Sequence, residues 1–233
     1  MALSLRIRDV VPATPRACLV RIDLLGQSFD YLAGQAVVVG DSGGAQRRPY
    51  SIAAAPEDAR ATGALELLVG VDDGDRPGPH LTLEPGVPVE VDGPYGSFTF
   101  PVRPVEREFV FVAGGTGIAP LRSMLRHALL GPLPVRRAAL LYSARTPDDF
   151  AFASEFHALA SSGAIDFRQT VTRAAGARWP GSRGRIDRDA LAPLVHGKDA
   201  LCFVCGPATM VDEIPKLLED MGVARERIKI EEW

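Results

Sequence analysis

The chain has 233 residues, 46% of them hydrophobic and 24% charged, with a formal net charge of −3. This length allows one large or two small domains, the composition is typical of a globular protein, and the weak negative charge does not favour nucleic acid as a partner. No apolar run approaches the roughly 20 residues that cross a bilayer, and the first residues lack a signal peptide's apolar core, so we expect a cytoplasmic protein without a membrane span.

Short β-rich segments separated by Gly, Pro or Asp fill the first hundred residues. Residues 1–10 alternate apolar and polar side chains, which is typical of an edge strand. Closely spaced strands with turn signals predict an antiparallel β-barrel over residues 1–102. The expected strands are 3–11, 17–25, 34–40, 48–55, 64–71 and 87–94.

From residue 103 to residue 233, strands alternate with helical patterns. This alternation predicts a Rossmann-like α/β domain with a parallel sheet and helical crossovers. The domain boundary should fall between residues 100 and 108. The expected strands are 108–115, 136–144, 164–172, 199–206 and 226–233, and the expected helices are 119–130, 148–160, 187–195 and 208–221.

A glycine-rich turn joins the first of these strands to the first helix, through Gly114, Gly115, Thr116 and Gly117, with Pro120 early in the helix. Such a turn lets backbone approach phosphate closely, and the helix amino terminus offers free N–H groups and about half a positive charge. The pattern is G-x-G-x-x-P, not the full dinucleotide fingerprint. We interpret it as phosphate binding; the alternative is a tight turn that needs positive φ.

A second loop, from Cys205 through Gly206 and Pro207 to Met210, follows the next-to-last parallel strand. Ligands of open parallel sheets lie beyond the carboxyl ends of the strands, where both loops fall. Cys205 therefore either faces a ligand or is a buried thiol at the strand end.

Three cysteines, including Cys18, are too few for an iron–sulfur cluster of the chain's own. Cys202 and Cys205 form a C-x-x-C pattern, but residues three apart on a strand point to opposite faces, which disfavours a disulfide. We interpret Cys202 as a small core residue. No metal site is expected.

In the stretch RPYS, Arg48 offers a fork for a phosphate, Tyr50 a ring face for stacking, and Ser51 a hydroxyl or N–H for a ring nitrogen. Strand alternation would place Pro49 with Ser51 on the face opposite Arg48 and Tyr50. Tyr and Ser are also ordinary residues on a barrel strand.

Together, RPYS, GGTGIAP and CGPATM, in this order and spacing, resemble the ferredoxin–NADP reductase family over essentially the whole chain. The resemblance implies a flavin-binding barrel followed by a nicotinamide-nucleotide domain. It also implies that Arg48 binds flavin phosphate, that Tyr50 packs on the isoalloxazine, and that Ser51 bonds near flavin N5.

The family's third flavin segment would correspond to RPGPHL, with backbone donors from His80 and Leu81. Gly78 stands where the family commonly has Ser or Thr, and Pro79 supplies no N–H. We favour FAD over FMN.

The terminal IEEW resembles the family's closing E-x-aromatic. It implies that Trp233 stacks on the flavin, moving aside for nicotinamide, and that Glu231 is a proton or polarity partner. The alternative for Trp233 is a frayed terminal residue. We expect Ser51, Cys205, Glu231 and Trp233 to form the catalytic set, with Thr116 bordering the nicotinamide.

NADPH is favoured over NADH because Thr172 and Arg173 resemble the family's S-R pair. Guanidinium groups suit a 2′-phosphate because their planar fork donates two N–H bonds. Arg145 is a further candidate, with Arg178, Arg183 and Arg185 nearby.

We expect a free-standing enzyme that passes hydride from NAD(P)H to FAD and then single electrons to a ferredoxin, another iron–sulfur or haem carrier, or an oxygenase. Arginines 6, 8, 16 and 21 would either steer an acidic carrier or form a solvated face. The alternatives are a flavin reductase or oxidase using free flavin or oxygen, an electron-transfer subunit of a larger complex, and a non-redox nucleotide sensor.

Overall fold

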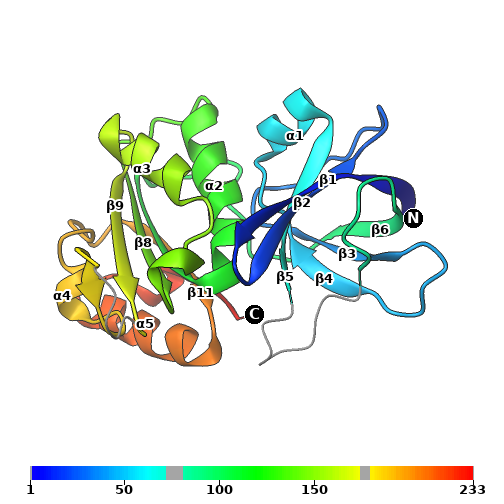
Figure 1. Cartoon of the computed structure of the whole chain (residues 1–233). Coiled ribbons are helices and arrows are strands. Elements are labelled where there is room, and N and C mark those ends of the chain that lie inside the picture. Colours follow the sequence, from blue (N-terminus) through cyan, green and yellow to red (C-terminus); the bar gives the residue numbers. More distant parts are fainter. Residues whose placement is uncertain (1, 72–80, 174–178, 233) are drawn as a thin grey trace. The chain divides into compact units, whose positions relative to one another are not determined.

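The computed structural model describes residues 2–71, 81–173 and 179–232 (Figure 1). The chain divides into two compact units. The first comprises residues 1–102 together with 122–131, and the second comprises residues 103–121 together with 132–233. Within the described residues, no helix is both long and apolar enough to span a membrane.

The first unit is built on one antiparallel sheet in the order β4-β3-β6-β1-β2-β5. A bridge between Ile52 and Leu67 joins the chain just after β4 to β5, so the two ends of the sheet meet and the barrel closes. The strands are β1 (Leu3–Thr14), β2 (Ala17–Asp23), β3 (Ala36–Asp41), β4 (Arg48–Ser51), β5 (Ala64–Gly70) and β6 (Pro88–Tyr95).

The prediction that the first strand lies at an edge is wrong. β1 pairs with β2 on one side and with β6 on the other, for example Ser4 with Glu90. Its alternation reflects two faces: Leu5 and Ile7 are buried in the barrel core, whereas Arg6 and Arg8 are exposed. An alternating pattern reports one solvated face and says nothing about how many neighbours a strand has.

A short helix, α1 (Pro56–Thr62), was not expected from the sequence. Pro56 occupies its first turn, where a missing N–H costs little. Asp58 accepts the N–H of Ala55 at 3.2 Å, and Gly63 ends the helix in the left-handed conformation with φ of 66°. The helix therefore carries ordinary start and stop signals within seven residues.

The second unit holds a parallel sheet in the order β10-β9-β8-β7-β11-β12. Its central strands β7 and β11 are buried except for Glu108 at the start of β7, which explains their continuous apolar sequences. The strands are β7 (Glu108–Gly114), β8 (Arg137–Ala144), β9 (Asp166–Val171), β10 (Ser182–Arg183), β11 (Leu201–Gly206) and β12 (Ile228–Glu232).

The remaining helices connect these strands. Helix α2 begins in the second unit, and its residues from Arg122 onward belong to the first. The helices are η1 (Gly115–Gly117), α2 (Ile118–Leu130), η2 (Pro147–Asp149), α3 (Ala153–Ser161), α4 (Arg188–Leu191), α5 (Ala208–Asp220) and η3 (Arg225–Arg227). The expected helix 187–195 shrinks to the single turn of α4.

The sheet of the second unit is covered on both faces. Val110 and Val204 pack with α4 and α5 side chains such as Leu191 and Ile214. On the other face, Tyr142 contacts Phe156 of α3, with ring centroids 6.5 Å apart. Consecutive residues of a buried strand thus pack into two different cores, one on each face of the sheet.

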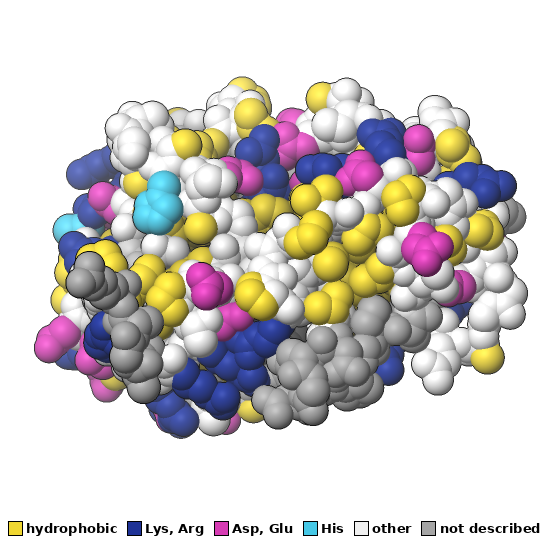
Figure 2. All heavy atoms as spheres, in the orientation of Figure 1, with side chains coloured by type: hydrophobic (Ala, Val, Ile, Leu, Met, Phe, Trp, Pro, Cys, Tyr) yellow, Lys and Arg dark blue, Asp and Glu magenta, His cyan; other side chains and the backbone are white. Residues whose placement is uncertain are grey.

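Acidic and basic side chains are intermixed along the upper part of the face shown in Figure 2, whereas Lys and Arg side chains gather toward its lower edge. Ion pairs account for part of the arginine content: Arg8 lies 3.1 Å from Asp23, and Arg21 lies 3.0 Å from Asp9. At least two of the four arginines considered for carrier steering, Arg8 and Arg21, therefore already have carboxylate partners.

Candidate functional site

The two predicted nucleotide loops meet at the carboxyl ends of adjacent strands. β7 ends at Gly114 and β11 ends at Gly206, and their registers place Ala113 beside Cys205. Met210 of α5 packs over both glycines. A Cβ on Gly206 would lie 2.6 Å from its Sδ, and one on Gly114 would lie 2.9 Å from its Cε. A side chain at either position would therefore require the end of the Met210 side chain to move.

The buried Tyr142 side chain holds the Gly114–Gly117 turn in place through a hydrogen bond. Gly115 has a φ of 54°, which favours glycine, so the alternative expectation of a tight positive-φ turn applies to this residue. The Tyr142 hydroxyl donates to the Gly115 carbonyl oxygen at 3.1 Å and accepts the Ala151 N–H at 3.3 Å. Tyr142 belongs to no motif that would mark it, from sequence alone, as a residue that orients this turn.

The helix that follows the turn begins as expected. Thr116 and Gly117 lie in η1, and α2 runs on from Ile118 with Pro120 in its first turn. N–H groups in the first turn of a helix have no hydrogen-bond partner within the helix. The missing N–H of Pro120 therefore breaks no helical hydrogen bond. The turn and helix start thus have the geometry that suits an anion.

Cys205 and Glu231 lie opposite each other in the ladder between β11 and β12. Burial raises the pKa of Glu231 to about 7. Burial, and then the charge of Glu231, raise the pKa of the Cys205 thiol above its ordinary value. The pair therefore combines a protonated thiol with a carboxyl group that titrates near neutrality.

All three cysteines are free thiols. Cys202 is fully buried in the core beneath α4 and α5, and burial raises its pKa to about 12. Cys205 is 1% exposed at the strand end.

The candidate 2′-phosphate residues lie together where β8 and β9 end. The Thr172 N–H donates to the Ala144 carbonyl at 2.9 Å, and the Arg173 N–H donates to the Arg145 carbonyl at 2.7 Å. Arg183 of β10 is in register with Val171. Arg185 instead lies 3.5 Å from Glu213, and Arg178 lies outside the described residues.

In the first unit, RPYS forms strand β4, paired with β3 so that Ser51 lies opposite Ala36 and Tyr50 opposite Val37. Arg48 and Pro49 are exposed, whereas Tyr50 and Ser51 are half-buried. Burial raises the pKa of Tyr50, whose ring also packs against the barrel core. A cation, a half-open phenol ring and a hydroxyl thus succeed one another along one short strand.

Of the segment expected to be the third to contact the flavin, the structure describes only Leu81. The Leu81 side chain is buried in the barrel core. The next residue, Thr82, donates its N–H and hydroxyl to Asp41 at the end of β3, the hydroxyl at 2.7 Å. His80, Gly78, Pro79 and Trp233 lie outside the described residues.

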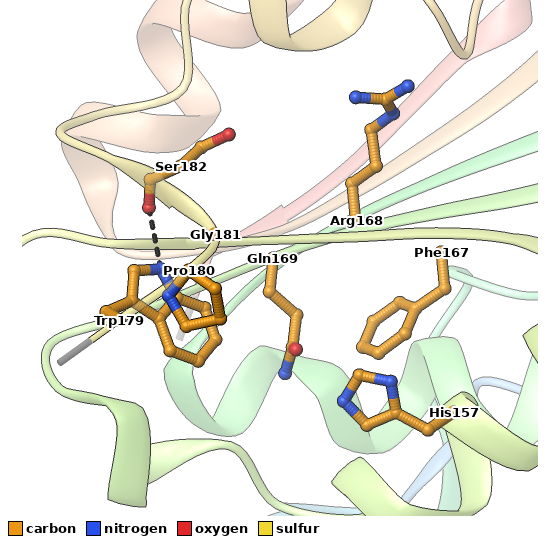
Figure 3. Close-up of a pocket in the computed structure, with 8 residues that line it drawn as sticks. All are labelled: His157, Phe167, Arg168, Gln169, Trp179, Pro180, Gly181 and Ser182. Atoms are coloured by element: carbon orange, nitrogen blue, oxygen red, sulfur yellow. Dashed lines mark hydrogen bonds between the residues drawn. The ribbon is translucent and has the colours of Figure 1, made fainter.

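A pocket of about 600 Å³ opens at the β9 side of the second unit (Figure 3). Phe167 and Gln169 of β9 project toward it, and Arg168 points to the opposite side of the strand. The Trp179 indole N–H donates to the Ser182 carbonyl at 2.9 Å, and its ring stacks on Phe150 at 5.5 Å. The lining contains none of the residues expected to bind a cofactor; it consists of His157, Phe167, Arg168, Gln169, Trp179, Pro180, Gly181 and Ser182.

Among the described residues, no group of three or more His, Cys, Asp or Glu side chains could hold a metal ion. The donor set is instead one of backbone N–H groups, hydroxyls and guanidinium groups, which suits phosphate and heteroaromatic rings.

Comparison with known proteins agrees with this chemistry. The oxidoreductase NAD-binding domain matches residues 111–216. Ferredoxin–NADP reductase B of Sorangium cellulosum is 33% identical, over 97% of this chain and 94% of that protein.

Solved structures share the fold over the whole chain. A cytochrome P450 reductase of Amycolatopsis superposes with a TM-score of 0.86 at 26% identity, covering 100% of this chain and 69% of that one. A ferredoxin NADP+ reductase from Neisseria gonorrhoeae with bound FAD and NADP gives 0.82 at 23% identity, covering 99% and 98%.

The fold and the strand-end loops define an oxidoreductase with a domain of the NAD-binding type. The chain belongs to the ferredoxin–NADP reductase family. This confirms the resemblance drawn from the three motifs and the expected combination of an antiparallel barrel and a Rossmann-like parallel sheet.

Proposed function

We propose that this enzyme passes hydride from NAD(P)H, bound by residues 103–233, to FAD, bound by residues 1–102, and then single electrons to a ferredoxin-type or oxygenase acceptor. The observation that carries the proposal is the convergence of the Gly114–Gly117 turn and the Cys205–Met210 loop at neighbouring strand ends, with Glu231 beside Cys205. The name of the Sorangium relative supports the reaction class.

The residues of β4 fit a flavin. The exposed Arg48 guanidinium would hold the flavin phosphate, and the half-open Tyr50 ring would pack on the isoalloxazine. Ser51 would donate near flavin N5, next to Pro49 and Tyr50 in the same strand. FAD is favoured over FMN, with backbone N–H groups of His80 and Leu81 at the pyrophosphate.

The second unit fits the nicotinamide nucleotide. The N–H groups of Gly115, Thr116 and Gly117 and the start of α2, near Pro120, would bind the pyrophosphate. Gly206, Pro207 and Met210 would shape the floor beside the turn, since Met210 already lies on both strand-end glycines. Thr116 and Cys205 would border the nicotinamide.

A bound flavin supplies acceptance of a hydride and stepwise release of two electrons. The chain's part is to orient the nicotinamide and to handle the proton left behind when the two electrons depart one at a time. Glu231, whose pKa lies near neutrality because it is buried, would take up and release that proton. The buried Cys205 thiol would set how closely the nicotinamide approaches the flavin. Trp233 would cover the flavin face until nicotinamide binds.

NADPH is favoured as donor because Arg145, just after β8, and Arg173, just after β9, are linked through their backbones at two neighbouring strand ends. Two guanidinium groups there would share the charge of a 2′-phosphate. NADH lacks that phosphate and would gain nothing from the pair.

The acceptor is tested by steady-state turnover. NADPH oxidation by the purified protein should accelerate strongly with a plant- or bacterial-type ferredoxin and slow as salt rises, because steering by charge is screened. Equal rates with oxygen or free flavin alone would favour a flavin reductase or oxidase. Co-purification with an oxidoreductase partner would favour an electron-transfer subunit.

A further inference from the structure

Helix α2 makes two side-chain contacts with the stretch that follows the RPYS strand. Nη1 of Arg122 donates to the Ala53 carbonyl oxygen at 2.9 Å. Oγ of Ser123 donates to the Ala54 carbonyl oxygen at 2.6 Å. Arg122 is 8% exposed and Ser123 is 0% exposed, so both contacts are sealed from water.

The contacts of Arg122 and Ser123 satisfy backbone carbonyl groups just beyond the end of β4, where the ladder with β3 no longer does so. The pairing of β4 with β3 stops at Ser51 opposite Ala36. Beyond it, the Ala53 N–H donates to the Glu66 carbonyl at 2.7 Å, and the Tyr31 hydroxyl donates to the Ala54 carbonyl at 2.9 Å. Ala53 and Ala54 are buried, so their carbonyl groups need partners from the protein.

The buried guanidinium is neutralised by a carboxylate of the barrel. Nη1 of Arg122 lies 2.8 Å from Oε2 of Glu66, and Nε of Arg21 lies 2.8 Å from Oε1 of the same group. Burial alone would raise the pKa of Glu66, but the two arginines hold it below its ordinary value. The carboxylate therefore stays charged and keeps Arg122 in place.

We propose that Arg122 and Ser123 are positioning residues for the flavin strand. By fixing the backbone at Ala53 and Ala54, they set how Tyr50 and Ser51, two to four residues earlier in the chain, are presented to the flavin. The inference rests on the proposed function, because it assigns a role at the same flavin site. Neither residue touches the flavin; each acts through the strand.

The same helix supplies a matched control. Arg126, one turn after Arg122, pairs with Asp58 of α1, its Nη2 lying 2.7 Å from Oδ1. Arg122→Met and Arg126→Met thus each break one partly buried arginine–carboxylate pair between α2 and the barrel. Only Arg122→Met also removes the donor to Ala53.

The experiment measures three properties of wild type, Arg122→Met, Arg122→Lys and Arg126→Met. These are the FAD dissociation constant by fluorescence quenching, the shape of the flavin absorption band, and the midpoint of thermal unfolding. We expect Arg122→Met to weaken FAD binding at least tenfold and to alter the band, with partial recovery in Arg122→Lys. Arg126→Met should lower the unfolding midpoint while leaving affinity and band shape unchanged.

If Arg122→Met does not fold, Ser123→Ala tests the same inference, because it removes only the hydroxyl that donates to Ala54. We expect it to weaken FAD binding severalfold. The inference is overturned if the folded Arg122→Met or Ser123→Ala protein binds FAD like wild type with the same band, or if Arg126→Met shows the same changes. If wild type binds no flavin, the proposed function falls with it. If wild type binds FAD and these variants match it, this inference alone falls.

Discussion

Glu231 sits directly opposite Cys205 across the parallel ladder that joins β12 to β11. Burial gives this carboxyl group a pKa of about 7, far from its ordinary value of 4.5. The thiol opposite is itself held protonated by burial and by the neighbouring charge. Groups with perturbed pKa values concentrate at functional sites, and this pair lies near the carboxyl ends of β11 and β12, where β11 leads into the Cys205–Met210 loop.

The titration of Glu231 should be visible in stability. The unfolded chain loses this proton near pH 4.5 and the folded protein near pH 7, so the free energy of unfolding falls as pH rises between these values and levels off above. At about 1.4 kcal/mol per pKa unit, reduced by solvent screening at a part-exposed carboxylate, we expect a loss of roughly 1–2 kcal/mol.

Urea unfolding from pH 5 to pH 8 measures this loss. Glu231→Gln should flatten the pH dependence, whereas the exposed neighbour Glu232 supplies the control variant Glu232→Gln, which should keep it. The same slope in wild type and Glu231→Gln would remove the shifted carboxyl group from the account.

Cys205→Ser should slow flavin reduction by NADPH by about tenfold to hundredfold, because small errors in approach are costly for direct transfer. The flavin should remain bound, since Cys205 belongs to the parallel-sheet unit. Stopped-flow absorption gives the rate. Cys202→Ser, buried in the core on the other face of β11, should cost stability instead; a rate as fast as wild type in Cys205→Ser would exclude the thiol from the catalytic set.

Arg173→Ala should raise the KM for NADPH by about tenfold to a hundredfold and leave that for NADH unchanged, because a charge-assisted bond of roughly 1.5–3 kcal/mol to the 2′-phosphate is lost. Arg168→Ala, at an exposed position in the middle of β9, the strand that ends two residues before Arg173, is the control. Parallel losses with both nucleotides would defeat the assignment.

Gly206→Ala should lower stability by about 1 kcal/mol, at the low end for overpacking, because its Cβ would lie 2.6 Å from Sδ of Met210 and the end of that flexible side chain would have to move. Met210→Ala removes that neighbour, so the double variant should be more stable than the sum of the single effects predicts. A double-mutant cycle in urea measures the coupling. Additive effects would mean that the contact does not constrain the strand ends.

Much of the fold follows from local pattern. Continuous apolar runs such as the one ending at Gly114 predicted buried parallel strands, and Gly or Pro punctuation predicted the barrel strands. The position of β1 could not be predicted, because neighbours are set by pairings such as Ser4 with Glu90, far apart in sequence. Helix α1 could not be predicted from the sequence, because its seven residues are too few to show a helical period.

The motif residues were accessible from sequence, but their supports were not. The Tyr142 hydroxyl reaches Gly115 across 27 positions, and Arg122 reaches Glu66 across 56. In sequence, Tyr142 is one more aromatic in a buried strand, and Arg122 is one polar residue on an amphipathic helix. Only the packing of sheet against helix gives such residues a role.

We propose that a nicotinamide nucleotide bound by one part of the chain reduces a flavin bound by the other. The proposed reduction is measured by visible absorption of the purified protein, loaded with FAD in the absence of oxygen and then mixed with NADPH or NADH. We expect flavin bands at about 370 and 450 nm that bleach within the mixing time or a few seconds, sooner with NADPH. A folded protein that takes up no flavin, or whose bound flavin keeps its colour with both nucleotides, would contradict the claim.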